Sequence, residues 1–311
     1  MQIFFMVEKV IIIGSGPAGC AAAIYCARDG LKPLLIRGFQ AGGQLTTTMA
    51  VENYPGFPSI LGPSLMDKMY EHVKTQSCTV LDDDVSKVDL NNYPYTVYVD
   101  EKEYKTYSII IASGANVRWL GLENEKRLVG KGVSNCATCD GPFFKNKDVV
   151  VVGGGDTAME DALYLSTLAK SVTLIHRKHE FRASKVMQER VFSNPSIKII
   201  WDSVVEDIMG KEKISGLKIK DLISGKSKTV KTDGLFIAIG HTPNTDLFKG
   251  QLDLDEEGYI ETKDFTKTNK RGVFAAGDVQ DRVYKQAVIA AGWGAMAAID
   301  VRRFLSEKQL I

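Results

Sequence analysis

The sequence predicts an α/β fold built from two nucleotide-binding units. Three observations support this prediction. An apolar strand, a glycine-rich turn and a helix follow one another near the N-terminus, and the same order recurs in the middle of the chain. The third observation is the size of the chain. Its 311 residues, with 44% hydrophobic and 25% charged side chains, suffice for two domains that each bury a core.

The first unit starts near Lys9, where an apolar strand runs into the turn GSGPAG. Gly14 allows the tight turn, Gly16 lets the backbone approach a pyrophosphate, and Gly19 lets the helix pack closely on the strand. The N-terminus of that helix would face the phosphates. A second apolar strand at residues 34–36 completes a βαβ unit, and this context predicts nucleotide binding.

The acidic residue that usually follows the second strand of such a unit is missing. That residue binds a ribose hydroxyl, but here Ile36 is followed by Arg37, Gly38, Phe39 and Gln40. The amide of Gln40 is the nearest substitute, and it makes a weaker hydrogen bond than a carboxylate.

The second unit starts at Asp148, where Gly153, Gly155 and Ala158 match the pattern GxGxxA between a strand and a helix. The predicted architecture is therefore two Rossmann-like dinucleotide-binding domains. A chain with two such units is expected to bind two nucleotides.

The second unit carries cations where a ribose carboxylate would stand. Ile175 ends its second strand, and His176, Arg177 and Lys178 follow, with Arg182 four residues further. A guanidinium binds a 2′-phosphate through bidentate, charge-assisted hydrogen bonds, so this strand end favours NADP over NAD. A solvated basic strand end is the alternative.

A pair of cysteines in a CxxC pattern, Cys136 and Cys139, lies between the two glycine motifs. Thiols at this spacing close into a disulfide with little rearrangement, and one of them usually has a lowered pKa. Half of a zinc site is the alternative, but zinc requires four ligands and no second CxxC or HxxxH pair accompanies this one. Asp140 follows the pair and would move a proton if burial raises its pKa, the alternative being an ordinary turn aspartate.

The other cysteines are expected to have no chemical role. Five cysteines are too few for a disulfide framework. Cys20 and Cys26 lie in a helix of small residues and Cys78 precedes a strand, so all three are predicted to be small buried hydrophobes.

Composition excludes several classes of partner. Lysine and arginine (39) balance aspartate and glutamate (38), so no positive field attracts nucleic acid. No apolar stretch reaches the roughly 18 residues of a membrane span, and the first ten residues carry Glu8 and Lys9 rather than a signal peptide. We therefore expect a cytoplasmic protein with no nucleic-acid or membrane partner; whether Met1 or Met6 starts the native chain stays open.

Three further apolar strands, in residues 107–115, 234–244 and 272–279, each end in small residues and a glycine turn. Such ends leave backbone amides free where a cofactor can lie. Asp278 follows the last of them and is placed to bind a sugar or ribityl hydroxyl. The Ala- and Gly-rich helix after it would pack closely under a cofactor or a partner, and plain close packing explains its composition equally well.

The order of these segments predicts a discontinuous arrangement. Residues 1–117 and 246–311 are expected to form one domain, and residues 118–245 a second domain inserted in the first. The chain would then cross between the domains at two adjacent points, which makes a hinge possible.

The chain resembles the low-molecular-weight thioredoxin reductases, which are NADPH-dependent flavoprotein disulfide reductases. The resemblance covers nearly the whole chain and rests on eight motifs in order: GSGPAG, AGGQLTTT, VENYPG, CATCDG, GGGDTA, HRK with Arg182, GHTPNT, and GVFAAGDV followed by Gln286 and Ala287. It implies that electrons pass from NADPH to FAD, then to the Cys136–Cys139 disulfide, and finally to thioredoxin or a thioredoxin-like protein, which maintains cellular redox homeostasis. A homodimer is expected from the resemblance alone.

The resemblance also implies a set of site residues. Cys139 would face the flavin, Cys136 would attack the partner disulfide, and Asp140 would exchange the proton; no metal is implied. The implied FAD contacts are Gly14, Ser15, Gly16, Pro17, Ala18, Gly19, Gly38, Gln40, Gly42, Gly43, Gln44, Asn53, Val85, Ser113, Gly277, Asp278, Lys285, Gln286 and Ala287. The implied NADPH contacts are Gly153, Gly154, Gly155, Asp156, Thr157, Ala158, His176, Arg177, Lys178, Arg182 and Ile239.

Three positions depart from the pattern of the thioredoxin reductases. Lys178 stands where a second arginine is usual, which keeps the charge but loses a bidentate fork, so we expect weaker discrimination against NADH. Gln40 lacks the charge of the usual acidic residue, and Trp293 replaces a common aspartate. None of these changes removes a catalytic group.

Three rival functions remain at this point. A ferredoxin-reducing enzyme of the same fold lacks the dithiol that this chain has. A dithiol oxidase, which passes electrons from thiols to oxygen, would not need the cations at Arg177 and Arg182. A non-catalytic CxxC zinc module or a flavin-containing interaction protein is the third rival, and stoichiometric zinc without flavin would favour the zinc module.

Overall fold

The structure is a computed structural model that describes residues 7–38, 41–48 and 50–311. The chain divides into two compact units. We call Met1–Asn116 together with Thr242–Ile311 the first unit, and Val117–His241 the second unit.

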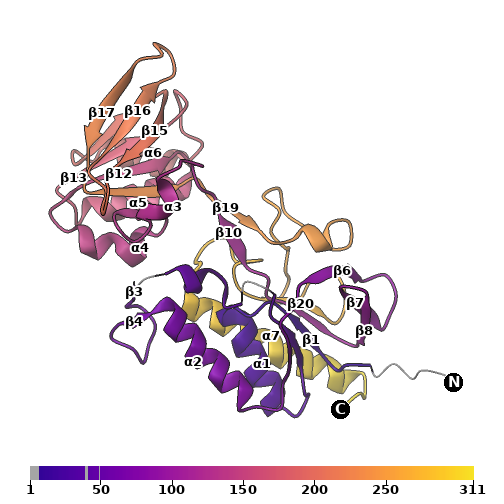
Figure 1. Ribbon diagram of the computed structural model, residues 1–311. Helices are drawn as coiled ribbons and strands as arrows, with labels where there is room; N and C mark the ends of the chain where they lie inside the picture. Colours follow the sequence, from indigo (N-terminus) through magenta and orange to yellow (C-terminus); the bar gives the residue numbers. More distant parts are fainter. Residues whose placement is uncertain (1–6, 39–40, 49) are drawn as a thin grey trace. The chain divides into compact units, whose positions relative to one another are not determined.

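The first unit contains a five-stranded parallel sheet in the order β20-β9-β1-β2-β5 (Figure 1). Its strands are short: β1 (Ile11–Ile13), β2 (Leu34–Ile36), β5 (Thr79–Leu81), β9 (Ile109–Ile111) and β20 (Val273–Ala275). Every residue of β1, β2, β9 and β20 is buried. Such continuous apolar strands are typical of a parallel sheet covered on both faces.

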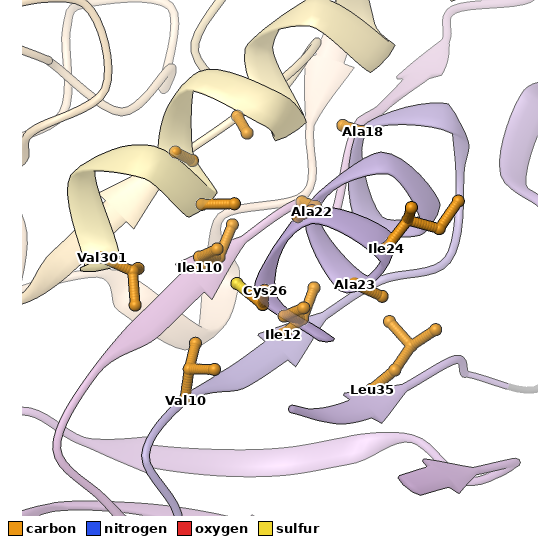
Figure 2. Packing of buried hydrophobic residues seen from close by; sticks show 14 of the residues in the cluster. Val10, Ile12, Ala18, Ala22, Ala23, Ile24, Cys26, Leu35, Ile110 and Val301 are labelled. Atoms are coloured by element: carbon orange, nitrogen blue, oxygen red, sulfur yellow. The ribbon is translucent and has the colours of Figure 1, made fainter. Parts of the chain in front are cut away.

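Alternate residues of these strands face two different layers. Ile12, Leu35 and Ile110 belong to one hydrophobic cluster with the helices α1 (Pro17–Arg28) and α7 (Ala287–Glu307) (Figure 2). The helix α2 (Gly62–Lys74) adds residues to the same cluster. Ile11 and Ile109 belong to another cluster with an antiparallel three-stranded sheet, which is β6 (Val85–Asp89), β7 (Tyr95–Val99) and β8 (Lys102–Thr106). The core of this unit therefore lies on both faces of the parallel sheet.

The helices α1 and α7 approach each other closely. A methyl group added at Gly294 would lie 2.0 Å from the carbonyl oxygen of Ala18, and Ala297 and Ala298 are fully buried. Small side chains are what such an approach requires. Close packing inside the first unit thus explains the Ala- and Gly-rich composition of α7.

The second unit repeats this plan. Its parallel sheet has the order β11-β18-β12-β13-β14, one face carries helices, and the other carries an antiparallel sheet in the order β15-β16-β17 (Figure 1). The elements are α3 (Glu125–Leu128), β11 (Val133–Ser134), α4 (Ala137–Asp140), η2 (Gly141–Phe144), β12 (Asp148–Gly153), α5 (Asp156–Ser166), β13 (Ser171–Ile175), α6 (Lys185–Phe192), β14 (Ile197–Ile200), β15 (Ser203–Met209), β16 (Gly216–Asp221), β17 (Ser227–Lys231) and β18 (Gly234–Ala238). The prediction of an α/β fold with two Rossmann-like units is confirmed.

The chain passes between the units twice, and both passages lie in paired strands. These strands are β10 (Ala115–Val117) and β19 (His241–Pro243), which form a two-stranded sheet. The remaining elements of the first unit are η1 (Gly43–Thr47), β3 (Ala50–Val51), β4 (Ile60–Leu61) and η3 (Asp246–Phe248).

Three cysteines lie outside the CxxC pair, and they differ in exposure. Cys20 and Cys26 are buried, as expected, whereas Cys78 is partly exposed. Burial raises the pKa of all three thiols, so each is a weak nucleophile at neutral pH. Within the described ranges, no helix is both long enough and apolar enough to cross a membrane.

Candidate functional site

The glycine turn of the first unit combines two crowded glycines with one open glycine. Gly14 has φ +104°, and a methyl group there would lie 2.3 Å from the carbonyl oxygen of Ala112. A methyl group at Gly19 would lie 1.8 Å from the carbonyl oxygen of Gly14. Around Gly16, by contrast, no atom of the described residues other than its neighbours along the chain lies within 4 Å of that position. Two glycines are thus required by the fold, and the middle one leaves space beside the turn.

The turn of the second unit shows the same pattern. A methyl group at Gly153 would lie 2.3 Å from the carbonyl oxygen of Ala238, whereas the position beside Gly155 is open. Gly154 is crowded as well, because a methyl group there would lie 2.1 Å from Cε1 of His176. The sequence motif does not reveal this third constraint, since it arises from a side chain more than twenty residues away.

Both turns fit the pyrophosphate of a dinucleotide. The open glycines, Gly16 and Gly155, are the N-caps of α1 and α5, and as glycines they supply no side-chain hydrogen bond to the first helical turn. The backbone N–H groups of a first helical turn need acceptors, and phosphate oxygens supply them. An open face next to such donors is the arrangement that binding of a dinucleotide requires.

The predicted NADPH cations divide into two kinds. Arg177, Lys178 and Arg182 are exposed, whereas His176 is 6% exposed and packs against Phe181. Burial, followed by the nearby arginines, lowers the pKa of His176, so its ring is neutral at neutral pH. The backbone N–H of Arg182 donates to the carbonyl oxygen of Gly154 at 2.8 Å, which brings this arginine to the glycine turn.

Other predicted NADPH residues lie around the same turn. Thr157 and Ala158 belong to the first turn of α5, and Ile239 directly follows β18, the neighbour of β12 in the sheet. The carboxylate of Asp156 accepts hydrogen bonds from the backbone N–H and the hydroxyl of Ser184, at 2.9 and 2.8 Å. Asp156 therefore fastens the start of α6 to the glycine turn.

Hydrogen bonds bring together the predicted FAD residues next to the first glycine turn. The hydroxyl of Ser15 donates to the carbonyl oxygen of Arg37 at 3.0 Å and accepts from the backbone N–H of Gly42 at 3.1 Å. The turn, the end of β2 and the start of η1 are thereby joined. Gly38, Gly42 and Gly43 have φ between +63° and +92°, a region that favours glycine.

The remaining predicted FAD residues of the first unit make more distant contacts. The amide of Asn53 donates to Oε1 of Gln286 at 3.0 Å, and the hydroxyl of Ser113 donates to the carbonyl oxygen of Asn244 at 2.8 Å. Gln44 bonds Asn116 at 3.2 Å. Pro17 and Ala18 open α1, Val85 opens β6, Gly277 has φ +79° and Ala287 opens α7. Gln40 lies outside the described residues.

A carboxyl and an amine, both partly buried, lie between β20 and α7. Burial, and secondly the charge of Asp281, raises the pKa of Asp278 to about 6, while Lys285 opposes the shift. Burial lowers the pKa of Lys285. A carboxyl in this setting is suited to accept a hydrogen bond from a sugar hydroxyl, which replaces the lost hydration.

The two CxxC cysteines form a disulfide with an S–S distance of 2.06 Å. Cys136 is the N-cap of α4, and hydrogen-bond donors lie next to its sulfur atom. Its Sγ accepts from the backbone N–H of Cys139 at 3.2 Å and lies 3.4 Å from the hydroxyl oxygen of Thr138. Donors at a sulfur favour its thiolate form, so Cys136 is the thiol that the surroundings activate.

A buried serine and a carboxyl lie beside the disulfide. The backbone N–H of Cys136 donates to Oγ of Ser134 at 3.0 Å. Burial raises the pKa of Asp140, and the hydroxyl of Ser134 opposes this shift. Asp140 is therefore able to hold a proton nearer neutral pH than an exposed aspartate.

The dithiol is built on the same unit as the second glycine turn. The helix α4 and the following turn pack on α5, since a methyl group at Gly141 would lie 2.9 Å from Cε1 of Tyr164. α5 starts at the open glycine of that turn. A disulfide and a dinucleotide motif on one rigid framework indicate a redox function.

The family model described as pyridine nucleotide-disulphide oxidoreductase matches residues 8–294. The chain belongs to this family of disulphide oxidoreductases. Within the family, the thioredoxin reductase of Rickettsia prowazekii is 51% identical over 305 residues, which cover 96% of this chain and 98% of the relative. The thioredoxin reductase of Streptomyces coelicolor is 51% identical over 304 residues, covering 96% and 94%.

Solved structures agree with this membership. The disulphide oxidoreductase superposes on a thioredoxin reductase from Giardia duodenalis with a TM-score of 0.92 at 40% identity, covering 96% of this chain and 98% of that one. The resemblance to the low-molecular-weight thioredoxin reductases is thereby confirmed. Use of FAD and NADPH follows from membership, and both glycine turns fit that use.

Two features of this disulphide oxidoreductase were not predicted from its sequence. Burial raises the pKa of Asp161 on α5 to about 7, with a further contribution from Glu160. The guanidinium of Arg37 stacks on the ring of Tyr70, 3.6 Å from its centroid. The spacing of Asp161 from Tyr164 and Leu165 places it on one helix face with them, which was the available signal for its burial.

Proposed function

We propose that this protein is an NADPH-dependent thioredoxin-disulfide reductase, which takes electrons from NADPH through FAD and the Cys136–Cys139 disulfide to thioredoxin or a thioredoxin-like protein. The observation that supports it most directly is the disulfide beside a glycine turn in one unit. Relatives that are about half identical over nearly their full length are thioredoxin reductases.

We further propose which part of the chain holds each cofactor. Residues 1–117 with 246–311 would hold FAD along the first glycine turn, η1, Asp278 and the start of α7. Residues 118–245 would hold NADPH on the second turn, with Arg177, Lys178 and Arg182 around the 2′-phosphate. The open glycines, Gly16 and Gly155, support this assignment because they leave space beside N-terminal helix turns.

The chemistry that bound FAD supplies is two-electron transfer between a nicotinamide and a disulfide. The chain's own part begins when two electrons break the bond between the sulfurs of Cys136 and Cys139. One proton is taken up, which leaves one thiol and one thiolate. The thiolate is favoured at Cys136, because the N–H of Cys139 and the hydroxyl of Thr138 lie at its sulfur.

Thiol–disulfide exchange then carries the electrons to the partner. The thiolate of Cys136 attacks one sulfur of the partner disulfide, a mixed disulfide forms, and a partner thiolate leaves. The sulfur of Cys139 attacks the mixed disulfide, releases the second partner sulfur and restores the Cys136–Cys139 bond. Asp140 receives the proton of the Cys139 thiol and returns it to a leaving thiolate, for which its raised pKa suits it.

The setting of the enzyme is proposed from the resemblance. We place it in the cytoplasm as a homodimer that acts without nucleic acid or membrane. Near-balanced charge, with 39 basic and 38 acidic side chains, supports the absence of a polyanionic partner.

An anaerobic titration with NADPH tests the proposed function. The flavin spectrum is recorded for the wild-type protein and for Cys139→Ser, with zinc analysis of the same samples. Wild type should take up two equivalents of reductant and the variant one, because flavin and dithiol are separate redox centres. A flavin that NADPH does not bleach in either protein would disprove the proposal and favour an oxidase.

A further inference from the structure

A small cavity lies at the end of β2, next to the first glycine turn. Its volume is about 70 Å³, and its walls include Ser15, Arg37, Gly42, Met66 and Tyr70. These residues come from the glycine turn, the strand end, the start of η1 and the helix α2. The space exceeds what a single water needs.

Arg37 is held rigidly in the wall of this cavity. Its guanidinium stacks on Tyr70 with Cζ 3.6 Å from the ring centroid, and Nη1 pairs with the carboxylate of Asp82 at 2.8 Å. The side chain is 19% exposed, although Asp82 is 70% exposed. The stack fixes the plane of the guanidinium, and the exposed ion pair adds little energy.

One donor of this guanidinium is left without an acceptor. Nε of Arg37 is buried and has no hydrogen-bond partner among the residues that the structure describes. A buried donor without an acceptor is costly, and charged donors cost more than neutral ones. Native proteins rarely keep such a group unless a ligand or water meets it.

The ligand oxygen expected at this place is a hydroxyl of the adenosine ribose. In dinucleotide folds the end of the second strand meets the ribose, usually through a carboxylate that accepts from its hydroxyls. The described residues that directly follow β2, Arg37 and Gly38, carry no carboxylate, and the carboxylate that lines the cavity, Asp67, comes from α2 instead. A hydroxyl accepts as well as donates, so a fixed N–H can replace the missing carboxylate.

We propose that Arg37, held by Tyr70, is a specificity-determining residue that binds the adenosine ribose of FAD by donating a hydrogen bond from Nε to a ribose hydroxyl. The inference rests on the proposed binding of FAD by the first unit. It reverses the usual polarity of this contact, since the protein donates where related folds accept. The adenosine half of FAD, rather than the flavin half, is what this residue recognises.

The test measures how tightly different flavins bind to protein from which bound flavin has been removed, and binding is followed by quenching of flavin fluorescence. Dissociation constants are measured for FAD, for FMN, which lacks the adenosine, and for FAD analogues deoxygenated at the 2′ or 3′ position of the adenosine ribose. Arg37→Met should weaken FAD about tenfold and leave FMN unchanged. One deoxy analogue should bind wild type about tenfold more weakly than FAD and should show no further loss with Arg37→Met.

Matched variants distinguish the loss of this hydrogen bond from the loss of a positive charge and from misfolding. Lys74→Met removes the other cation over Tyr70, which lies 4.5 Å from the ring centroid and is exposed, and should leave all constants unchanged. Arg37→Lys keeps the charge and loses Nε, and should bind FAD as weakly as Arg37→Met. Tyr70→Leu removes the stacking surface and should also weaken FAD selectively, so the inference stays testable if one variant does not fold.

Several results would overturn the inference. These are an equal loss for FAD and FMN, a loss that persists with both deoxy analogues, or full recovery with Arg37→Lys, each of which would assign Arg37 to the phosphates or to folding. If wild type binds FAD and is bleached by NADPH while Arg37→Met binds FAD as tightly, only this inference fails. If wild type binds no flavin, the proposed function fails with it.

Discussion

Replacement of Gly16 by alanine should impair FAD binding while sparing the fold. Gly16 has φ −66° and ψ −174°, which alanine adopts without strain, and among the residues that the structure describes only its chain neighbours lie within 4 Å of the added methyl group. Alanine is a poorer N-cap than glycine, but it also lowers the entropy of the unfolded chain. The two effects offset each other, so the stability of the flavin-free protein should stay within about 1 kcal/mol of wild type.

The loss of FAD affinity follows from the same geometry. The methyl group of Gly16→Ala would occupy the space beside the turn that the pyrophosphate needs. Insertion of a methyl group into a close-packed contact costs about 1–3 kcal/mol, which corresponds to a roughly 5- to 150-fold weaker FAD complex. Gly19→Ala is the matched variant, because its methyl group would lie 1.8 Å from the carbonyl oxygen of Gly14.

Two measurements separate these variants: urea unfolding of the flavin-free proteins, and FAD binding followed by quenching of flavin fluorescence. Gly19→Ala should be less stable than Gly16→Ala by more than about 2 kcal/mol, since a clash with backbone cannot relax by rotation of a side chain. The reasoning is refuted if Gly16→Ala is destabilised as much as Gly19→Ala, or if Gly16→Ala binds FAD as tightly as wild type.

Three further predictions concern the second unit. Gly155→Ala should raise the KM for NADPH about tenfold with unchanged flavin content, because the space beside Gly155 is also open; equal KM values would contradict this. Asp161→Asn should be more stable than wild type above pH 7, by at most about 4 kcal/mol, and equal to it below pH 4. The sign follows because the raised pKa means that the folded state binds the extra proton, so wild type loses stability as the pH rises from about 4 to about 7; urea unfolding that shows the same pH profile for both proteins would rule this out. Lys178→Arg should increase the ratio of kcat/KM for NADPH over NADH, and no change in that ratio would show that Lys178 does not contact the 2′-phosphate.

Local patterns predicted the parts of the fold that depend on neighbouring residues. The turn GSGPAG and its flanking apolar runs predict a strand, a tight turn and a helix from neighbouring residues alone, and the structure confirms these elements. The CxxC pair likewise needs only its own spacing to form a disulfide. Family membership was also within reach, since eight motifs in a fixed order carry far more information than any one of them.

Features that depend on distant packing were beyond the sequence patterns. Nothing near His176 indicates that its ring fills the space beside Gly154, and nothing near Arg37 points to Tyr70, which lies on α2. The antiparallel layers that cover each sheet also went unpredicted, because their strands look alike whichever face they cover. The domain limits and the individual cofactor contacts stay predictions, and Gln40 lies outside the described residues.

The order in which the chain is synthesised bears on the close approach of α1 and α7. The second unit is continuous from Val117 to His241, so it can fold as soon as that stretch has left the ribosome. The first unit needs β20 and α7, the last strand and helix of the chain, to pair with β9 and to cover α1. Until then the surface of α1 around the carbonyl group of Ala18, which Gly294 later covers, stays exposed, as do the apolar side chains of α1. The first hundred residues must therefore stay free of aggregation while the second unit is synthesised. A chain that stops before α7 would contain a folded second unit with its dithiol and an incompletely folded first unit.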